Sequence, residues 1–275
     1  MKEMTLQEVH QVCLDILKDI HEFCVRNEIK YSLSGGSLLG AIRHNGIIPW
    51  DDDIDLQMSR PEYEKFIHTY KSEKGYKLFS RELEGCEDVE IAFARVCEME
   101  KTHVNTGTAP WQGTPTGVWI DILPIDGAPN SERQARKRIR LMRFVWNMTL
   151  AVRARIFSVP FSIAKSRRMA WRLFVKKVMA LFIPRNINEV YIKMCKKYDY
   201  NSSEYIANFS TMQYGFREWQ PRRGMEEFVL HEFEGKKFYI MKEYDISLKS
   251  LYGNYMELPP ENKRKPHIAN MYFWK

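Results

Sequence analysis

The chain has 275 residues, a formal net charge of +7 and five cysteines. A chain of this length can bury a full hydrophobic core, and 44% hydrophobic residues is typical of a folded protein. The odd number of scattered cysteines, without a Cys-x-x-Cys pair, argues against a disulfide framework or a zinc site. The N-terminus lacks the apolar core of a signal peptide, and no uncharged apolar run reaches the ~18 residues of a spanning helix. We therefore expect a cytoplasmic protein.

The positive charge is concentrated in residues 133–183, which contain 14 lysines and arginines and no acidic residue. The remainder carries 28 basic residues, 42 less these 14, against 35 acidic ones and is net negative. Aromatic residues such as Trp171 and Phe174 are interleaved with the basic ones. The segment can be an ordinary solvated face, or it can contact the anionic inner face of a membrane peripherally. No motif that reads a nucleic-acid groove accompanies the charge, so we do not expect a nucleic-acid partner.

The first expected elements are two helices joined by a strand. The capping box Thr5-x-x-Glu8 opens an amphipathic helix that Asn27 can close. A short strand over 29–33 then ends at a glycine-rich turn, and a helix follows over 37–43.

The next expected strand, over 53–58, alternates polar and apolar residues. This period of two places Asp53 and Asp55 on one face and the apolar side chains on the other. The remaining pattern predicts a helix over 59–70, strands over 76–79, 89–96 and 117–123, two helices in the basic segment separated at 158–162, a helix over 187–198, a hairpin of 228–233 with 236–241, and a helix over 244–252.

Strands precede the long helices without regular alternation, which favours an α+β fold: a mixed β-sheet core with flanking helices and a basic helical insertion. We divide the chain into a catalytic core (1–130), the basic helical segment (131–200), and a C-terminal hairpin, helix and loop (201–275) that packs on the core.

Four carboxylates stand within five positions, at Asp51, Asp52, Asp53 and Asp55. Each close pair costs about 4 kcal/mol at an effective dielectric of ~20, which a fold tolerates when a cation lies among them. Asp121 interrupts an apolar strand, where an unpaired charge would be costly, and is the candidate third ligand. Carboxylate oxygens suit Mg²⁺ or Mn²⁺, which can bridge the diphosphate of a nucleotide. Asp51 or Asp52 could instead only cap a turn.

The turn Gly35-Gly36-Ser37 opens a helix and can offer backbone N–H groups to a phosphate. Arg43 is a candidate contact to the diphosphate. His44 could share that role, carry a proton, or simply stabilise a turn. The turn and the acid cluster together predict phosphoryl or nucleotidyl transfer.

The string GGSLLGAIRHNGIIPWDDDIDL resembles the signature of the LicD family of phosphocholine transferases, which fukutin-related proteins share. GVWIDILPIDG, the FEG of Phe233–Gly235 and LYGNYMELPPENKR also match, so the resemblance runs from about Leu6 to His267 and is weakest across the basic segment. It implies a nucleotidyltransferase-like fold with metal ligands at Asp51, Asp53, Asp55 and Asp121. It also implies transfer of phosphocholine from CDP-choline, or of another group such as ribitol phosphate from a similar CDP-linked donor, to a hydroxyl of a glycan or its lipid-linked precursor.

In the mechanism this implies, the acceptor hydroxyl attacks in line, CMP leaves, and Asp121 or Asp51 helps to remove the proton. Arg264 and His267, in the C-terminal loop, are expected to close over the site. A quaternary ammonium group binds aromatic faces, and the nearby aromatic residues, each of which could instead be core, are Trp50, Trp111 and Trp119.

Two other functions compete with this interpretation. A glycosyltransferase can use an Asp-x-Asp pair with a nucleotide sugar, but that fold has no phosphate turn at this spacing. A membrane-bound scaffold would use the basic helices and leave the intact acid cluster without a role.

Overall fold

The computed structural model describes residues 1–275 except 88, 90, 107–116, 154–165, 183–185 and 265–269. Its helices are α1 (Leu6–Arg26), α2 (Gly35–His44), α3 (Arg60–Thr69), α4 (Glu132–Arg153), α5 (Arg167–Ala180), α6 (Ile187–Cys195) and α7 (Tyr244–Tyr252), with short 3-10 turns η2 (Gly215–Glu218), η3 (Arg222–Met225) and η4 (Glu261–Lys263). Its strands are β1 (Lys2–Glu3), β2 (Ser32–Leu33), β3 (Asp55–Ser59), β4 (Lys77–Phe79), β5 (Ala94–Glu98), β6 (Thr102–Thr106), β7 (Val118–Ala128), β8 (Tyr205–Ala207), β9 (Gln220–Pro221), β10 (Phe228–Phe233), β11 (Lys236–Met241) and β12 (Asn270–Trp274).

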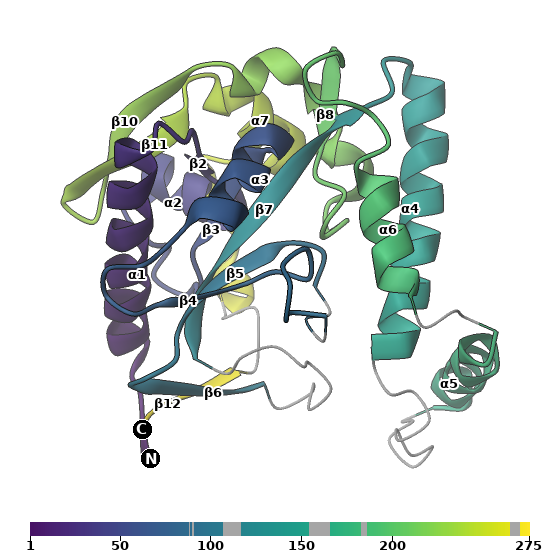
Figure 1. Cartoon of the computed structure of the whole chain (residues 1–275), viewed down its shortest axis with the longest axis horizontal. Helices are drawn as coiled ribbons and strands as arrows, with labels where there is room; N and C mark the ends of the chain where they lie inside the picture. Colours follow the sequence, from purple (N-terminus) through teal and green to yellow (C-terminus); the bar gives the residue numbers. More distant parts are fainter. Residues whose placement is uncertain (88, 90, 107–116, 154–165, 183–185, 265–269) are drawn as a thin grey trace.

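A mixed sheet organises the molecule, with the strand order β2-β3-β7-β5-β4. The long strand β7 runs through its middle, parallel to β3 and antiparallel to β5 (Figure 1). Further along β7, β8 adds to the same strand and β9 pairs with β8. A mixed sheet with helices around it confirms the predicted α+β class.

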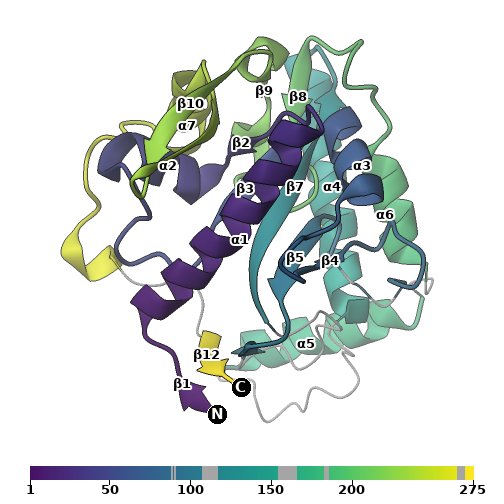
Figure 2. The same ribbon diagram turned by 60° about the vertical axis from the view of Figure 1, so that its left-hand side comes forward.

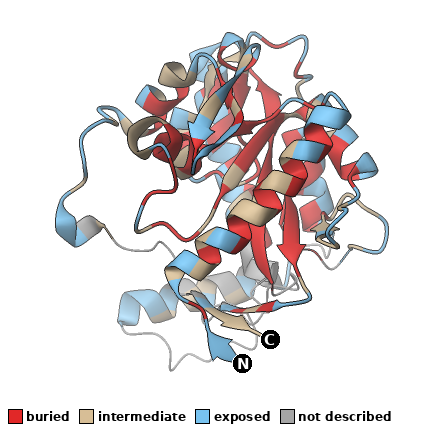
Figure 3. Ribbon diagram, turned by 90° about the vertical axis from the view of Figure 1, so that its left-hand side faces the viewer, coloured by how far each residue is buried: buried red, intermediate tan, exposed pale blue. Residues whose placement is uncertain are grey.

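Helix α1 forms as its sequence predicts and covers the sheet. The Thr5 hydroxyl accepts the Glu8 N–H at 3.2 Å, and the Glu8 carboxylate accepts the Thr5 N–H at 2.8 Å, which completes the capping box. The apolar stripe of the helix is buried and lies across β7 and β5 (Figure 2). In Figure 3 the central strands of the mixed sheet and the inner side of α1 are buried, while the outer side of α1 is largely exposed.

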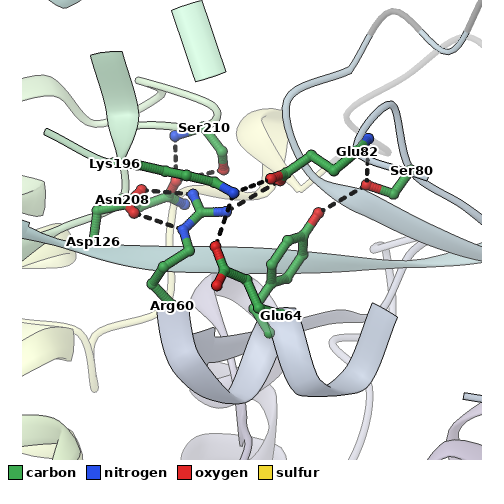
Figure 4. A network of polar contacts seen from close by, with 9 residues as sticks. Arg60, Glu64, Ser80, Glu82, Asp126, Lys196, Asn208 and Ser210 are labelled. Atoms are coloured by element: carbon green, nitrogen blue, oxygen red, sulfur yellow. Dashed lines mark hydrogen bonds and ion pairs between the residues drawn. The ribbon is translucent and has the colours of Figure 1, made fainter. Parts of the chain in front are cut away.

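A buried ion network fixes α3 to the far half of β7 (Figure 4). The Arg60 guanidinium donates two hydrogen bonds to the Asp126 carboxylate, at 2.7 and 2.8 Å, and a third to Glu82 at 3.1 Å. Lys196, just after α6, bridges Glu82 and Glu64. Each buried charge in the network has a partner of opposite sign. The network thereby links α3 to β7 and to the end of α6.

The basic segment forms helices α4 and α5, as predicted. Helices α4 and α6 pack together over a second apolar cluster that includes Met142 and Tyr191 (Figure 1). The expected break at 158–162 lies outside the described residues. No helix in the described parts of the chain is both long and apolar enough to cross a bilayer.

The hairpin β10–β11 and helix α7 have the predicted bounds. Glu234 and Gly235 form the hairpin turn with φ of +53° and +67°, the left-handed conformations that such a turn requires. The hairpin lies beside β2, where the Ser32 hydroxyl accepts the Met241 N–H at 2.9 Å.

The strand expected at 89–96 was misplaced. Strand β5, which pairs with β7, begins only at Ala94, while Val89, Ile91 and Phe93 are buried in a small cluster with Leu123. Their hydrophobicity therefore reflects burial of a loop, which a period-two pattern cannot distinguish from a strand.

The small sheet of β1, β12 and β6 was not predicted. It joins the two ends of the chain to residues 102–106. Partners so far apart in sequence leave no local signal.

Candidate active site

A cavity of about 910 Å³ opens where the sheet meets the C-terminal segments. One side, which we call the acidic wall, is formed by Asp51, Asp53, Asp55 and Asp121 together with Gly35 and Gly36. The structure thus gathers all four predicted catalytic aspartates at one cavity. The side chain of Asp52 is not part of the lining, and its Oδ2 accepts the Tyr272 hydroxyl at 2.9 Å.

Strand register explains how residues 66 positions apart in sequence meet. Asp55 on β3 stands directly beside Asp121 on β7, and Asp121 stands beside Arg95 on β5. Side chains opposite one another on adjacent strands project to the same face of a sheet. The result is a row of two carboxylates and one guanidinium across three strands.

Arg95 is the counter-ion of Asp121. Its Nε and Nη2 donate to the two carboxylate oxygens at 2.6 and 3.0 Å. The guanidinium lies 4.1 Å from the ring centre of Trp119, which holds it in place. This fork uses one edge of the Asp121 carboxylate and leaves the remaining lone pairs for another cation or a proton.

The cluster of Asp51, Asp52 and Asp53 fits a divalent cation. Oxygens of Asp51, Asp52 and Asp53 all lie within 4.8 Å of one another, and the buried Oδ1 of Asp52 accepts no hydrogen bond from the described residues. Burial raises the pKa of Asp53 and of Asp55 well above the usual range, and neighbouring carboxylates raise them further. A hard cation with oxygen ligands would relieve both effects.

The glycine turn leads directly into α2 beside the carboxylates. Gly35 has φ of +50°, a conformation that favours glycine. A Cβ on Gly36 would lie 2.7 Å from Asp51 Oδ2, so only glycine fits without a shift. Ser37 is buried behind the turn, where its hydroxyl accepts the Asp55 N–H at 2.9 Å. The predicted binding residues of the turn therefore have different positions. Gly35 and Gly36 line the cavity, whereas Ser37 hydrogen-bonds the turn to β3.

Arg43 lines the cavity, whereas the next residue, His44, does not. Arg43 Nη1 donates to the carbonyls of Tyr255 and Glu257, at 2.9 and 3.1 Å, so it holds the C-terminal loop at the cavity edge. His44 contacts the edge of Trp50 and is not among the described lining residues. Burial and the charge of Arg43 lower the pKa of His44.

The expected aromatic and C-terminal contacts are partly described. Trp50 lines the cavity, and the Arg264 guanidinium lies 5.6 Å from its ring centre. Trp119 is covered by Arg95 and does not line the cavity. Trp111 and His267 lie outside the described residues.

Sequence reasoning missed Arg95 and three other residues that line the cavity, Tyr214, Glu218 and Tyr252. Arg95 interrupts an apolar strand just as Asp121 does, so the same argument could have found it. Tyr252 belongs to the LYGNYMELPPENKR string. Tyr214 and Glu218 lie in an irregular segment without a pattern that predicts their role.

A family model described as LicD/FKTN/FKRP, nucleotidyltransferase domain, matches residues 28–123. Across 275 residues, 97% of this chain and 97% of the relative, the chain is 34% identical to the lipopolysaccharide cholinephosphotransferase LicD of Haemophilus influenzae. It is also 32% identical over 117 residues to the ribitol 5-phosphate transferase FKRP of Homo sapiens, which covers 40% of this chain and 24% of that protein. The four lining aspartates, Gly35 and Gly36 lie within the matched domain.

Proposed function

The chain belongs to the LicD family, and from this premise we propose that it transfers phosphocholine, or a similar phospho-substituent, from a CDP-linked donor to a hydroxyl of a glycan or lipid-linked glycan. It is an enzyme that transfers substituted phosphate groups to glycans. The observation that carries the finer proposal is the convergence of four aspartates and a glycine-rich helix start on one cavity.

Charge supports a metal-dependent mechanism. Six carboxyl groups line the cavity, and Arg43 is the one basic side chain among its described lining residues. A diphosphate would be repelled by this surface unless cations neutralised it. We assign Asp51, Asp53, Asp55 and Asp121 to hold Mg²⁺ or Mn²⁺, which when bound would neutralise the charge of the diphosphate and of the transition state.

The chain's own groups would then orient and deprotonate the reactants. The free N–H groups at the start of α2 can bind the phosphate that is transferred. The acceptor oxygen forms a bond to the phosphorus that bears choline, the bond from that phosphorus to CMP breaks, and the hydroxyl proton passes to Asp121 or Asp51. Arg95 fixes the orientation of Asp121. Trp50 and Tyr255 offer aromatic faces to a quaternary ammonium group.

Ribitol phosphate is the second candidate for the transferred group, because of the similarity to FKRP. The acidic wall is suited to either donor, since both carry the same diphosphate. Only residues that contact the choline or ribitol group itself would distinguish one donor from the other.

A panel of CDP-linked donors, assayed for CMP release with Mg²⁺ and with EDTA, tests the proposal. We expect release from CDP-choline or CDP-ribitol with Mg²⁺, an increase when a glycan acceptor is added, and loss with EDTA. Activity that persists in EDTA would refute the metal assignment. Turnover of UDP-sugars alone would favour the glycosyltransferase.

For the basic segment 133–183, we propose contact with an anionic membrane surface that carries the acceptor. On α5, Trp171, Phe174 and Val178 are exposed at helical spacing, and the first two rings stack at 5.6 Å. The exposed Arg167 and Arg168 stand at the start of the same helix. An exposed apolar stripe beside arginines matches the interface of an anionic bilayer.

Vesicle flotation tests this contact. We expect the protein to float with vesicles that contain phosphatidylglycerol and not with pure phosphatidylcholine, and the double change Trp171→Ser/Phe174→Ser to abolish flotation. Leu230→Ser, at an exposed apolar position on the hairpin, is the matched control. Equal flotation of the double variant would show that α5 is an ordinary solvated face.

A further inference from the structure

A second group of lining residues differs in chemistry from the aspartates. We call it the polar wall, and its side chains come from the segment between β8 and the start of β9: Asn208, Thr211, Gln213, Tyr214, Glu218 and Gln220. They comprise three amides, two hydroxyls and one carboxyl group. Such a set both donates and accepts hydrogen bonds and carries no lysine or arginine that would attract a phosphate.

The polar wall reaches the acidic wall through a pair of tyrosines. The hydroxyls of Tyr214 and Tyr252 are 2.8 Å apart and hydrogen-bonded. The position of a Cβ on Gly35 lies 3.6 Å from the Tyr252 hydroxyl and 4.0 Å from Asp55 Oδ2. The tyrosine pair therefore stands beside the glycine turn and the carboxylate of Asp55.

Ring stacking and hydrogen bonds anchor the segment that carries the polar wall. Trp219 stacks on Tyr205 with ring centres 4.0 Å apart, and its indole N–H donates to the Pro129 carbonyl at 2.9 Å. The Arg217 guanidinium and the Ser250 hydroxyl form two further hydrogen bonds, each of 2.7 Å, that tie η2 to α7. Polar groups held in this way need little ordering when a ligand binds.

Several of these polar groups remain available to a ligand. The side chains of Thr211 and Gln213 make no hydrogen bond to other described residues. Asn208 uses its oxygen to accept from Ser210 and from the Thr211 N–H, so its amide N–H groups are left for another acceptor. Glu218 accepts the Tyr214 N–H at 3.2 Å, and burial raises the pKa of its carboxyl to about 7.

The other lining groups suit the donor better. Around Arg43 the cavity is bordered by apolar and aromatic side chains, among them Leu39, Ile48, Trp50 and Tyr255. A flat base or a quaternary ammonium group binds such faces, whereas a ring with many hydroxyls needs several fixed donors and acceptors.

We infer that the polar wall is the acceptor subsite, that it takes the neutral, hydroxyl-rich ring of a sugar, and that Tyr214 and Tyr252 hold the reacting hydroxyl beside Asp55. This inference rests on the proposed function, because it divides one cavity between donor and acceptor.

Two readouts test it, using Tyr214→Phe and Gln213→Ala in the full chain. The first is the KM for core oligosaccharide released from lipopolysaccharide and the KM for CDP-choline. The second is calorimetric binding of the same oligosaccharide without a donor. We expect each change to raise the acceptor KM about tenfold and to weaken oligosaccharide binding similarly, while the donor KM stays within twofold. Tyr244→Phe, on α7 but outside the cavity lining, is the control and should change neither.

The outcomes separate this inference from the proposed function. A rise in the donor KM with an unchanged acceptor KM would make the polar wall a nucleotide subsite and overturn the inference. Unchanged acceptor KM and unchanged oligosaccharide binding would overturn it as well. If the wild-type protein releases no CMP from any CDP-linked donor, the proposed function fails, while weaker oligosaccharide binding by the variants would still support the acceptor subsite.

Discussion

The acidic wall and the polar wall face the same cavity but are built in different ways. In the acidic wall, Asp55 and Asp121 lie on adjacent strands, so strand register brings them into one row with Arg95. The polar wall comes from an irregular segment held by aromatic stacking and by hydrogen bonds to α7. A sheet gives Asp55 and Asp121, two of the groups proposed to hold the metal, a fixed spacing, whereas the groups proposed to select the acceptor lie on a segment that can vary.

The largest expected effect comes from removing charge from the acidic wall. We predict that Asp53→Asn/Asp55→Asn lowers CMP release about 10⁴-fold, or ~5 kcal/mol, because the metal loses two ligands. The melting temperature in EDTA should stay equal or rise, since two buried like charges are removed. A CMP-release assay measures the first effect, and scanning calorimetry with and without Mg²⁺ measures the second. Stabilisation by Mg²⁺ that persists in the variant would contradict the metal assignment.

Variants of the two buried arginine–aspartate forks should distinguish an effect on catalysis from an effect on folding. Arg95–Asp121 faces the cavity side of the sheet, and Arg60–Asp126 lies in the network of Figure 4, away from the described lining. Arg95→Met and Arg60→Met should each cost about 3 kcal/mol of unfolding free energy, because a buried carboxylate loses its counter-ion. Only Arg95→Met should also lower kcat of the folded protein.

Urea unfolding and kinetics on the folded fraction measure the two effects of the forks. Arg60→Met/Asp126→Leu should recover most of the lost stability, because no unpaired charge remains. A similar loss of kcat in both single variants would mean that the forks act only through the fold.

A methyl group on the glycine turn should produce a smaller loss. We predict that Gly36→Ala lowers kcat about 10- to 100-fold, because its Cβ would displace the Asp51 carboxylate 2.7 Å away. Gly224→Ala is the matched control, since its Cβ would meet Ile246 at 3.8 Å or more, an ordinary contact. Steady-state kinetics and melting temperatures should show a kinetic defect for Gly36→Ala alone, and equal kinetics would place Gly36 outside the phosphate site.

The smallest predicted effect is a pH dependence from the polar wall. Burial raises the pKa of Glu218 from 4.5 to about 7, so the folded protein holds this proton where the unfolded chain has released it. Stability contributed by Glu218 is therefore present below pH ~4.5 and is lost as the pH rises through 7. Glu218→Gln lacks this loss. The unfolding free energy of this variant, relative to that of wild type, should therefore rise by ~1 kcal/mol between pH 4.5 and pH 8. This value is reduced because solvent in the cavity screens the charge.

Urea midpoints at the two pH values provide this measurement. An identical difference between Glu218→Gln and wild type at both values would show that Glu218 titrates normally.

Much of the acidic wall could be predicted because its signals are local. The glycine turn and the Asp-x-Asp pair each depend on a few neighbouring residues, as does the capping box of α1. The same locality explains why the hairpin and α7 were predicted with the observed bounds. It also explains the error at 89–96, where apolar residues that line a buried loop have the composition of a strand.

The sequence by itself determined the candidate groups: four aspartates, a glycine-rich turn, and the spacing that joins them. Tertiary structure decided which of these groups face the cavity, that Asp121 is held by Arg95, and that Ser37 fastens the turn instead of lining the site. It also supplied the polar wall, whose residues are adjacent to the aspartates only in space. Motifs of a few residues specify the first set, whereas long-range packing assembles the second and leaves no short pattern in the chain.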